Sequence, residues 1–433
     1  ILPTLMRLTL PNLAAMLVVA LVAICETAYV GLLGTVPLAA IALVFPLVML
    51  TQMLSAGAMG GGVSSAISRA LGAGDLERAE ALTFHAIVIG AIVGAFFSIT
   101  FGVFGRPIFR TLGGSGEVLG QALIYANIAL TGSILAWLLN TSASIVRGTG
   151  NMRLPSLTLL VASALQIALG GVLGFGLGPI PGFGLAGVAS GLVIAQALST
   201  LYLLWFLRSG RGRVRLRLAP LQRGMFLDIL KVGAVSSLGP FQVVLTVLIL
   251  THLVARYGAE ALAGYGIGAR LEFLLVPIVF AVGVASVPMV GTAMGARDVK
   301  RARRVAWTAA GVATTLLGVI GFAVTVAPDL WSGLFTTDPA VRAAANLYLR
   351  WAGPGFAFVG LGLSLYFASQ GSGKVVAPVL AGMVRLLVIA AGGWWLAQSN
   401  APEWSLFALV GASMVASGLS VAAAVYLTTW RAG

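Results

Sequence analysis

Residues 8–33 read LTLPNLAAMLVVALVAICETAYVGLL, an apolar run that contains a single charged side chain, Glu26. A helix needs about 20 apolar residues to cross the hydrocarbon core of a bilayer, so this run is long enough for one span. The whole chain has the same character, because 59% of its 433 residues are hydrophobic, 9% are charged and the mean hydropathy is +1.03. Soluble domains carry about 25% charged residues. We therefore predict a polytopic membrane protein.

Twelve apolar segments are long enough to be spans. They cover residues 8–33, 38–69, 81–104, 118–147, 154–178, 184–207, 226–255, 261–295, 304–327, 341–369, 376–397 and 404–429. Backbone groups find no hydrogen-bond partner in lipid, so a span must be a helix or a strand of a closed barrel. These runs are far longer than the roughly 10-residue segments of a barrel, which predicts an all-α membrane protein. The first run is also too long for a signal peptide, so we interpret the start without methionine as a trimmed terminus.

Basic side chains collect in the loops that follow the even-numbered spans. Their positions are Arg69, Arg78, Arg147, Arg153, Arg208, Arg211, Arg213, Arg215, Arg217, Arg223, Arg297, Lys300, Arg301, Arg303 and Arg304. Cytoplasmic loops carry an excess of lysine and arginine, so these loops are predicted to share the cytoplasmic side. We expect both termini there, in the inner membrane of a bacterium or archaeon. Loop placement explains the net charge of +14, and no nucleic-acid partner is expected.

Internal repeats divide the chain into two halves. Three stretches recur 223 or 224 residues later. The pairs are GTVPLAA (34–40) with GAEALAG (258–264), LGAGDLERA (71–79) with MGARDVKRA (294–302), and RGTGNMRLP (147–155) with QGSGKVVAP (370–378). Because each half contains six spans, we predict two six-helix lobes that are parallel repeats related by a pseudo-twofold axis along the membrane normal. The predicted domains are an N-terminal lobe (1–207), a basic cytoplasmic linker (208–224) and a C-terminal lobe (225–433).

Four motifs carry a family resemblance. They are ETAYVGLLGTVPLAA (26–40), SRALGAGDLERAEAL (68–82), IVRGTGNMRLP (145–155) and SVPMVGTAMGARDVKRA (286–302). In order and spacing they resemble the multidrug and toxic compound extrusion (MATE) transporters, and the DinF branch more than the NorM branch. The resemblance implies an ion-coupled antiporter that exports amphipathic, often cationic organic compounds by alternating access. We expect a monomer in the lipid bilayer that binds its substrate in an apolar, aromatic cavity between the lobes.

Glu26 is the predicted ion-coupling residue. An ionised carboxylate inside a membrane is costly, and intramembrane acids commonly have a functional role. Protonation would remove its charge and change which helix packing is preferred, which couples a proton to the conformational change. The resemblance implies the same role, because relatives often carry aspartate followed by threonine at this place. The alternative is a carboxylate that is satisfied by hydrogen bonds and serves packing alone.

Four polar residues are candidates to support Glu26. Tyr29 lies three residues further along the same helix face. Asn127 is predicted at a similar depth to Glu26, whereas Asn140 and Gln166 are predicted to lie deeper in the membrane. The resemblance assigns Gln166 to a place where relatives often carry asparagine. Each of these residues is equally well explained as a polar contact between helices.

Two departures from the family pattern bear on the coupling ion. Gly170 and Gly171 stand where relatives often carry an Asp-Pro pair, so a second carboxylate is missing. Residues 232–248 and 353–371, where NorM-type relatives place acids for sodium, contain no acid. A proton on Glu26 is therefore the preferred coupling ion, and sodium is the alternative. One cysteine and two histidines are too few ligands for a metal centre, and no cofactor is expected.

The second half places four charged side chains inside predicted spans, namely Arg270, Glu272, Arg350 and Arg385. Arg270 and Glu272 are two residues apart and do not face each other on a helix. Arg350 lies at a similar depth to Glu272 and is its expected partner. Because buried charges are usually paired, an ion pair that locks the lobe and a place in the substrate cavity are equally supported.

Other functions are less well supported. A lipid-linked glycan or phospholipid flippase of the same superfamily would explain the membrane arginines, because guanidinium groups bind phosphates. The twelve spans and the MATE-like motifs oppose it. A membrane enzyme would need catalytic groups clustered at one depth, and the sequence shows no such cluster, so no enzyme is predicted. A channel would not need two asymmetric lobes with a single titratable acid.

Overall fold

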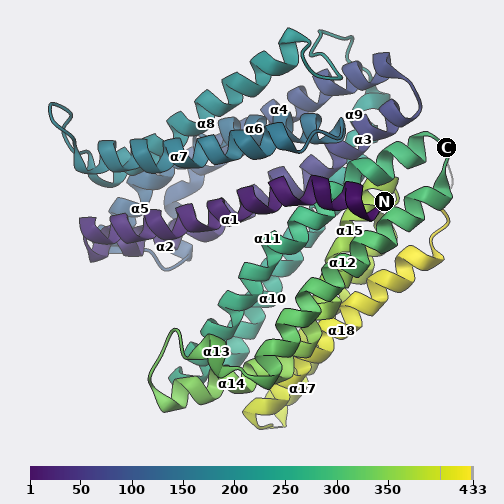
Figure 1. The fold of residues 1–433 in the computed structure, drawn as a ribbon. Coiled ribbons are helices and arrows are strands. Elements are labelled where there is room, and N and C mark those ends of the chain that lie inside the picture. Colours follow the sequence, from purple (N-terminus) through teal and green to yellow (C-terminus); the bar gives the residue numbers. More distant parts are fainter. Residues whose placement is uncertain (400, 431–433) are drawn as a thin grey trace. The chain divides into compact units, whose positions relative to one another are not determined.

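The computed structural model describes residues 1–399 and 401–430, which are helical along most of their length (Figure 1). The described residues form no β-strand. The helices are α1 (Leu2–Leu33), α2 (Thr35–Gln52), the π-helix η1 (Met53–Met59), α3 (Gly60–Gly72), α4 (Leu76–Thr111), α5 (Gly116–Ala129), α6 (Ser133–Gly148), α7 (Arg153–Phe175), α8 (Gly184–Ser209), α9 (Arg223–Ser236), α10 (Leu238–Ala255), α11 (Ala259–Gly295), α12 (Val299–Val326), α13 (Asp329–Ser332), α14 (Pro339–Ala352), the 3₁₀-helix η2 (Gly353–Gly355), α15 (Phe356–Ser372), α16 (Val376–Gly382), α17 (Val384–Gln398) and α18 (Glu403–Leu427).

The twelve predicted spans are confirmed. Within the described residues, eleven helical segments are long and apolar enough to cross a membrane, and the pair α5 and α6 supplies the twelfth. That pair bends by 45° at the residues between Ala129 and Ser133. Other spans are also interrupted, because α2 continues into η1 and α14 is joined to α15 through the Gly-Pro-Gly turn of η2. Discontinuous membrane helices of this kind are typical of transporters.

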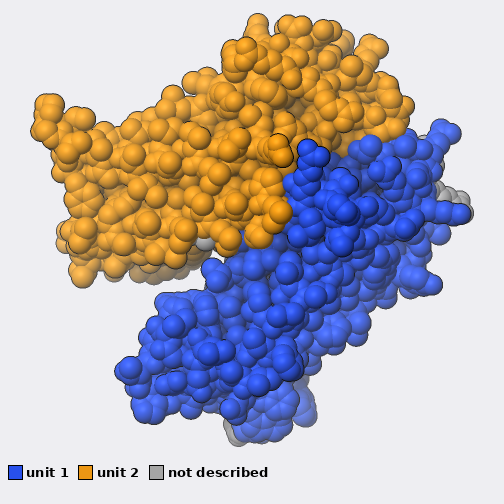
Figure 2. Space-filling model, in the orientation of Figure 1, with its two compact units in different colours: residues 1–9, 234–433 blue, residues 10–233 orange. Residues whose placement is uncertain are grey.

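The chain forms two compact units (Figure 2). Unit 1 consists of residues 1–9 and 234–433, and unit 2 consists of residues 10–233. These boundaries differ from the predicted domains at two places. The first nine residues belong to unit 1, because Leu5 is fully buried in the apolar core that also contains Leu250 and Tyr265. The predicted linker and residues 225–233 belong to unit 2.

The linker and the start of α9 are fixed to the rest of unit 2 by polar contacts. His85 on α4 is fully buried, and its Nε2 accepts a hydrogen bond of 2.9 Å from the backbone N–H of Gln222. The Nδ1–H of the same ring donates to the carbonyl of Ala81 at 2.7 Å. Further along, Asp228 on α9 forms ion pairs with Arg69 at 2.7 Å and with Arg78 at 2.9 Å. These contacts explain why residues 208–233 group with the first half of the chain.

Asp228→Asn is expected to lower the melting temperature of the purified protein in detergent. The substitution leaves Arg69 and Arg78 without their shared carboxylate, but solvent screens part of the loss because 49% of the Arg78 side chain is exposed. We expect a cost of about 1 kcal/mol, the upper end for exposed ion pairs. Glu117→Gln is the control, since Glu117 is an exposed acid that pairs with no cation among the described residues. Equal melting temperatures for wild type and Asp228→Asn would contradict the prediction.

The glycine-rich stretch GAMGGG (57–62) spans the end of η1 and the start of α3. Gly60, Gly61 and Gly62 are all buried. A Cβ atom added to Gly62 would lie 2.8 Å from the backbone nitrogen of Gly233 and from the carbonyl oxygen of Ile229. Gly62 therefore allows α3 and α9 to approach closely, as small residues commonly do in membrane bundles.

Helices α7 and α8 lie side by side in unit 2 (Figure 1). Each carries a pair of glycines four residues apart, Gly170 and Gly174 on α7 and Gly187 and Gly191 on α8. A Cβ atom added to Gly191 would overlap the backbone nitrogen of Gly170, and one added to Gly187 would overlap the carbonyl of Leu173. The two backbones are therefore in direct contact, which fixes α7 in place.

Candidate functional site

Glu26 lies on α1 and accepts hydrogen bonds from two other helices of unit 2. The Tyr125 hydroxyl, on α5, donates to Glu26 Oε1 at 3.2 Å. The Gln166 side-chain amide, on α7, donates to Glu26 Oε2 at 2.7 Å. Both donors are neutral, and no cationic side chain pairs with Glu26 among residues 1–399 and 401–430. An intramembrane acid on α1 is thus held by donors from two other helices, and none of the described residues provides a counter-ion.

Local packing positions both donors, Tyr125 on α5 and Gln166 on α7. Tyr125 is buried, with 5% of its surface exposed, in an apolar cluster that includes Val30 and Val188. Gln166 lies one helical turn before Gly170, where α7 contacts α8. Packing of α5 and α7 therefore aims both donors at the carboxylate. The prediction that Gln166 lies deeper than Glu26 is wrong, because the two side chains are in direct contact.

Tyr29 lies beside the site but does not bond to Glu26. Its ring packs edge-on against Phe175, with centroids 6.2 Å apart. Its buried hydroxyl has no hydrogen-bond partner among the described residues. A Cβ atom added to Gly170 would lie 2.7 Å from that hydroxyl. The glycine that replaces the acid of the family pattern therefore makes room for Tyr29.

The structure does not bring Asn127 or Asn140 to Glu26. Asn127 is exposed, and its backbone carbonyl accepts a hydrogen bond from the Thr131 hydroxyl. The amide of Asn140 donates to Gln52 Oε1 at 2.9 Å and to Ser55 Oγ at 2.8 Å. Asn140 therefore belongs to a separate polar cluster at the start of η1. Both predictions of support for Glu26 are corrected, because neither side chain forms a hydrogen bond with the carboxylate among the described residues.

Unit 1 contains its own intramembrane acid. Glu272 on α11 accepts a hydrogen bond of 2.7 Å from the guanidinium of Arg385 on α17, and this contact is also an ion pair. The Tyr348 hydroxyl on α14 donates to the other oxygen of Glu272 at 3.1 Å. The expected pairing of Glu272 with Arg350 is wrong, because the exposed Arg350 lies on another face of α14 and Arg385 takes its place. Arg270 instead stacks on the ring of Phe335 at 5.6 Å.

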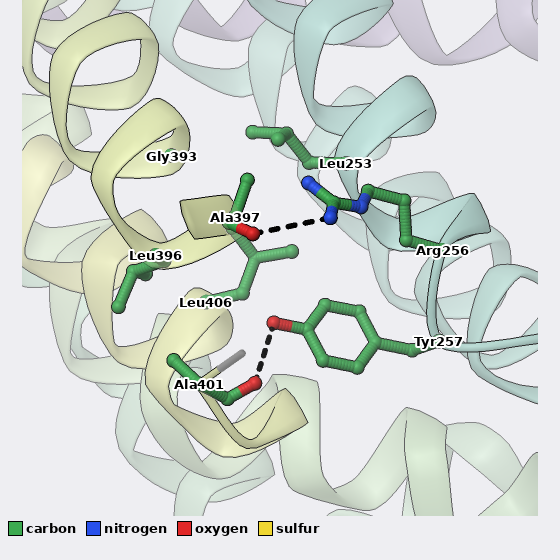
Figure 3. Close-up of a pocket in the computed structure, with 8 residues that line it drawn as sticks. All are labelled: Leu253, Arg256, Tyr257, Gly393, Leu396, Ala397, Ala401 and Leu406. Atoms are coloured by element: carbon green, nitrogen blue, oxygen red, sulfur yellow. Dashed lines mark hydrogen bonds between the residues drawn. The ribbon is translucent and has the colours of Figure 1, made fainter. Parts of the chain in front are cut away.

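A small pocket of unit 1 contains none of these residues (Figure 3). Its volume is about 180 Å³, below the about 300–1,000 Å³ of typical ligand pockets. Arg256 and Tyr257 reach across it from the end of α10 and donate to the carbonyls of Ala397 and Ala401, at 3.1 and 3.0 Å. This pocket is therefore a contact between helix ends and is too small for a drug-sized substrate. Within the described residues, no group of three or more histidine, cysteine or acidic side chains could hold a metal ion.

Comparison with known proteins identifies the family. The MatE family model matches residues 11–172 and 238–395. The FAD transporter of Shewanella oneidensis is 24% identical over 348 residues, which cover 80% of this chain and 76% of that protein. The multidrug export protein MepA of Staphylococcus aureus is 24% identical over 394 residues, which cover 89% of this chain and 85% of that protein.

A solved MATE structure in a bent conformation shows the same fold. It has a TM-score of 0.89 and 24% sequence identity, and the match covers 98% of this chain and 93% of the other. Solved MATE structures have twelve helices in two lobes, which agrees with the spans described above. The family and the named relatives are transporters and not enzymes. The family match extends over most of the length of the chain, and the chain therefore belongs to the MatE family, the MATE multidrug efflux transporters.

Proposed function

We propose that this protein is a proton-coupled antiporter that exports amphipathic, often cationic organic compounds, with Glu26 as the coupling acid. The observation that carries the proposal is the donor set of Glu26, which consists of the hydroxyl of Tyr125 and the amide of Gln166. A hydroxyl and a primary amide each contain a donor and an acceptor. After rotation of the hydroxyl or the amide, the same two residues can therefore bond to a protonated carboxyl group as well as to a carboxylate.

This property suits an acid that changes its protonation state during transport. A fixed cation beside Glu26 would favour the ionised form throughout the cycle. Neutral donors leave room for a proton to compensate the charge when the site is closed to water. The cost of an uncompensated charge in the membrane then links proton binding to the conformational change.

Location, oligomeric state and alternative substrates are proposed on the same basis. We place the protein in the inner membrane with both termini in the cytoplasm, acting as a monomer.

Sodium is the alternative coupling ion, because a carboxylate, a hydroxyl and an amide oxygen also suit a small cation. The flippase alternative loses support in unit 1, where Arg385 is neutralised by Glu272 and Arg270 stacks on Phe335. The FAD transporter among the relatives makes a larger anionic substrate the compound to test second.

Transport by the purified protein in proteoliposomes tests the proposal. Ethidium movement is followed under an imposed pH gradient and, separately, under an imposed sodium gradient at equal pH. We expect the pH gradient to drive ethidium transport and the sodium gradient to have no effect. A proton ionophore is the control, since it should remove the transport. Transport driven by sodium alone would contradict proton coupling, and transport of FAD but not of ethidium would contradict the proposed substrate class.

A further inference from the structure

Each of the two units contains an acid that accepts a hydrogen bond from a tyrosine. Tyr125 of unit 2 donates to Glu26 at 3.2 Å, and Tyr348 of unit 1 donates to Glu272 at 3.1 Å. The tyrosines are 223 residues apart, which is the offset of the sequence repeats, so they occupy equivalent positions. The acids are not equivalent, because Glu26 comes from α1 and Glu272 from α11. The two tyrosines are therefore equivalent, but the acids that they contact lie on helices that are not equivalent.

The second donor differs between the two acids. Glu26 has the neutral amide of Gln166 at 2.7 Å, whereas Glu272 has the cationic guanidinium of Arg385 at 2.7 Å. The side chains of Arg385 and Glu272 are only 15% and 21% exposed, so water screens their attraction weakly. The pair is electrically neutral and needs no further cation.

No second cation pairs with Glu272 among the described residues, since Arg270 lies over the ring of Phe335 and Arg350 is exposed. Besides Arg385 on α17 and Tyr348 on α14, a third titratable side chain of this group is Tyr265 on α11, whose ring lies 5.4 Å from that of Tyr348. Other helices of unit 1 contribute apolar side chains to the core that contains Tyr265 and Tyr348. These include Leu250 and Leu253 of α10, Leu317 of α12, Phe356 of α15 and Phe407 of α18.

We propose that the guanidinium of Arg385 is a permanent counter-ion of Glu272. It occupies the position that a coupling cation would take at this second acid, and thereby limits the protein to one coupling ion. The inference rests on the proposed role of Glu26 as the coupling acid. Arg385 acts through Glu272 and is a positioning residue. The ligand class that it excludes is a proton or a small monovalent cation. Unit 1 then takes up no ion during the cycle, while unit 2 takes up one.

The variant Arg385→Gln tests this directly, because it gives Glu272 a hydroxyl and an amide, the donor set of Glu26. Infrared spectroscopy of the purified protein across a pH titration measures protonated carboxyl groups without requiring transport. We expect Arg385→Gln to gain one protonated carboxyl band relative to wild type. That band should be absent from the double variant Arg385→Gln/Glu272→Gln, and Arg385→Lys, which keeps the cation, should not gain it.

Two further comparisons separate the outcomes. If Arg385→Gln does not fold, Glu272→Gln in the wild-type background provides the test, since the proposal requires that it removes no protonated carboxyl band. A folded Arg385→Gln without a Glu272-dependent band, or a band lost in Glu272→Gln alone, would overturn the inference. Wild type against Glu26→Gln tests the proposed function separately, because only that comparison reports on the acid of unit 2.

Discussion

Glu26→Gln is expected to abolish transport driven by a pH gradient while the protein remains folded. Glutamine has nearly the shape of glutamate and can still bond to Tyr125 and Gln166, so packing around α1 should be kept. It cannot bind or release a proton, so the gradient no longer biases the conformational equilibrium. A coupling free energy of about 1–3 kcal/mol corresponds to a 5–150-fold effect, and we expect the initial rate to fall at least about tenfold.

The measurement is ethidium transport in proteoliposomes that contain equal amounts of each variant. Exchange of ethidium down its own gradient should survive in Glu26→Gln, because it needs alternating access but no proton. Glu117→Gln is the matched control, since it removes an exposed acid at the start of α5 in the same unit. Wild-type rates in Glu26→Gln under a pH gradient would show that the carboxylate serves packing alone.

The neighbours of Glu26 allow a finer comparison. Tyr125→Phe keeps the aromatic ring in its apolar cluster and removes only the hydroxyl that contacts Glu26 Oε1. We expect it to keep proton-driven transport and to shift the pH at which transport is half-maximal, because the balance between the two forms of the acid changes. An unchanged pH profile would show that Tyr125 does not influence protonation of Glu26.

Hydropathy was enough to predict the spans, because crossing a membrane requires a long apolar run that is visible in one dimension. A lone acid in such a run also identified Glu26. The family pattern also points to Gln166, whereas counting residues along the span gives it the wrong depth. Counting residues along a span estimates the depth of a side chain but not the direction in which it points around the helix. Residues two apart on a helix do not share a face, so a prediction from depth alone selects Asn127 and overlooks Tyr125, the residue that bonds to Glu26.

The charges of unit 1 show the same limit. Arg350 and Arg385 are both arginines inside predicted spans, and depth along the spans favours Arg350 as the partner of Glu272. Arg350 stands on α14 two residues after Tyr348, so only one of these two side chains can face Glu272. The tyrosine does so, and the guanidinium comes from α17 instead. A tyrosine at the repeat offset of 223 residues was a signal in the sequence that could have identified both Tyr125 and Tyr348.

Gly191→Ala is expected to destabilise the protein and to impair transport, although Gly191 lies outside the acid site. The added Cβ would overlap the backbone nitrogen of Gly170, and backbone atoms cannot rotate away as a side chain can. Overpacking of this kind costs about 1–3 kcal/mol, which outweighs the gain of up to about 1 kcal/mol for replacing glycine by alanine within a helix. Displacement of α7 would also move Gln166, which lies one turn from Gly170, away from Glu26.

The control is Gly171→Ala, the neighbour of Gly170 on the same helix. A Cβ atom at Gly171 would meet no atom within 4 Å, so only the helix propensity changes. In detergent, Gly191→Ala should melt several degrees below wild type, while Gly171→Ala melts at the same temperature or slightly above. The transport rate should fall with the melting temperature in the first variant and stay unchanged in the second. A Gly191→Ala protein as stable as wild type would show that α7 and α8 can separate without cost. Contact between these two helices would then not be what positions Gln166 at Glu26.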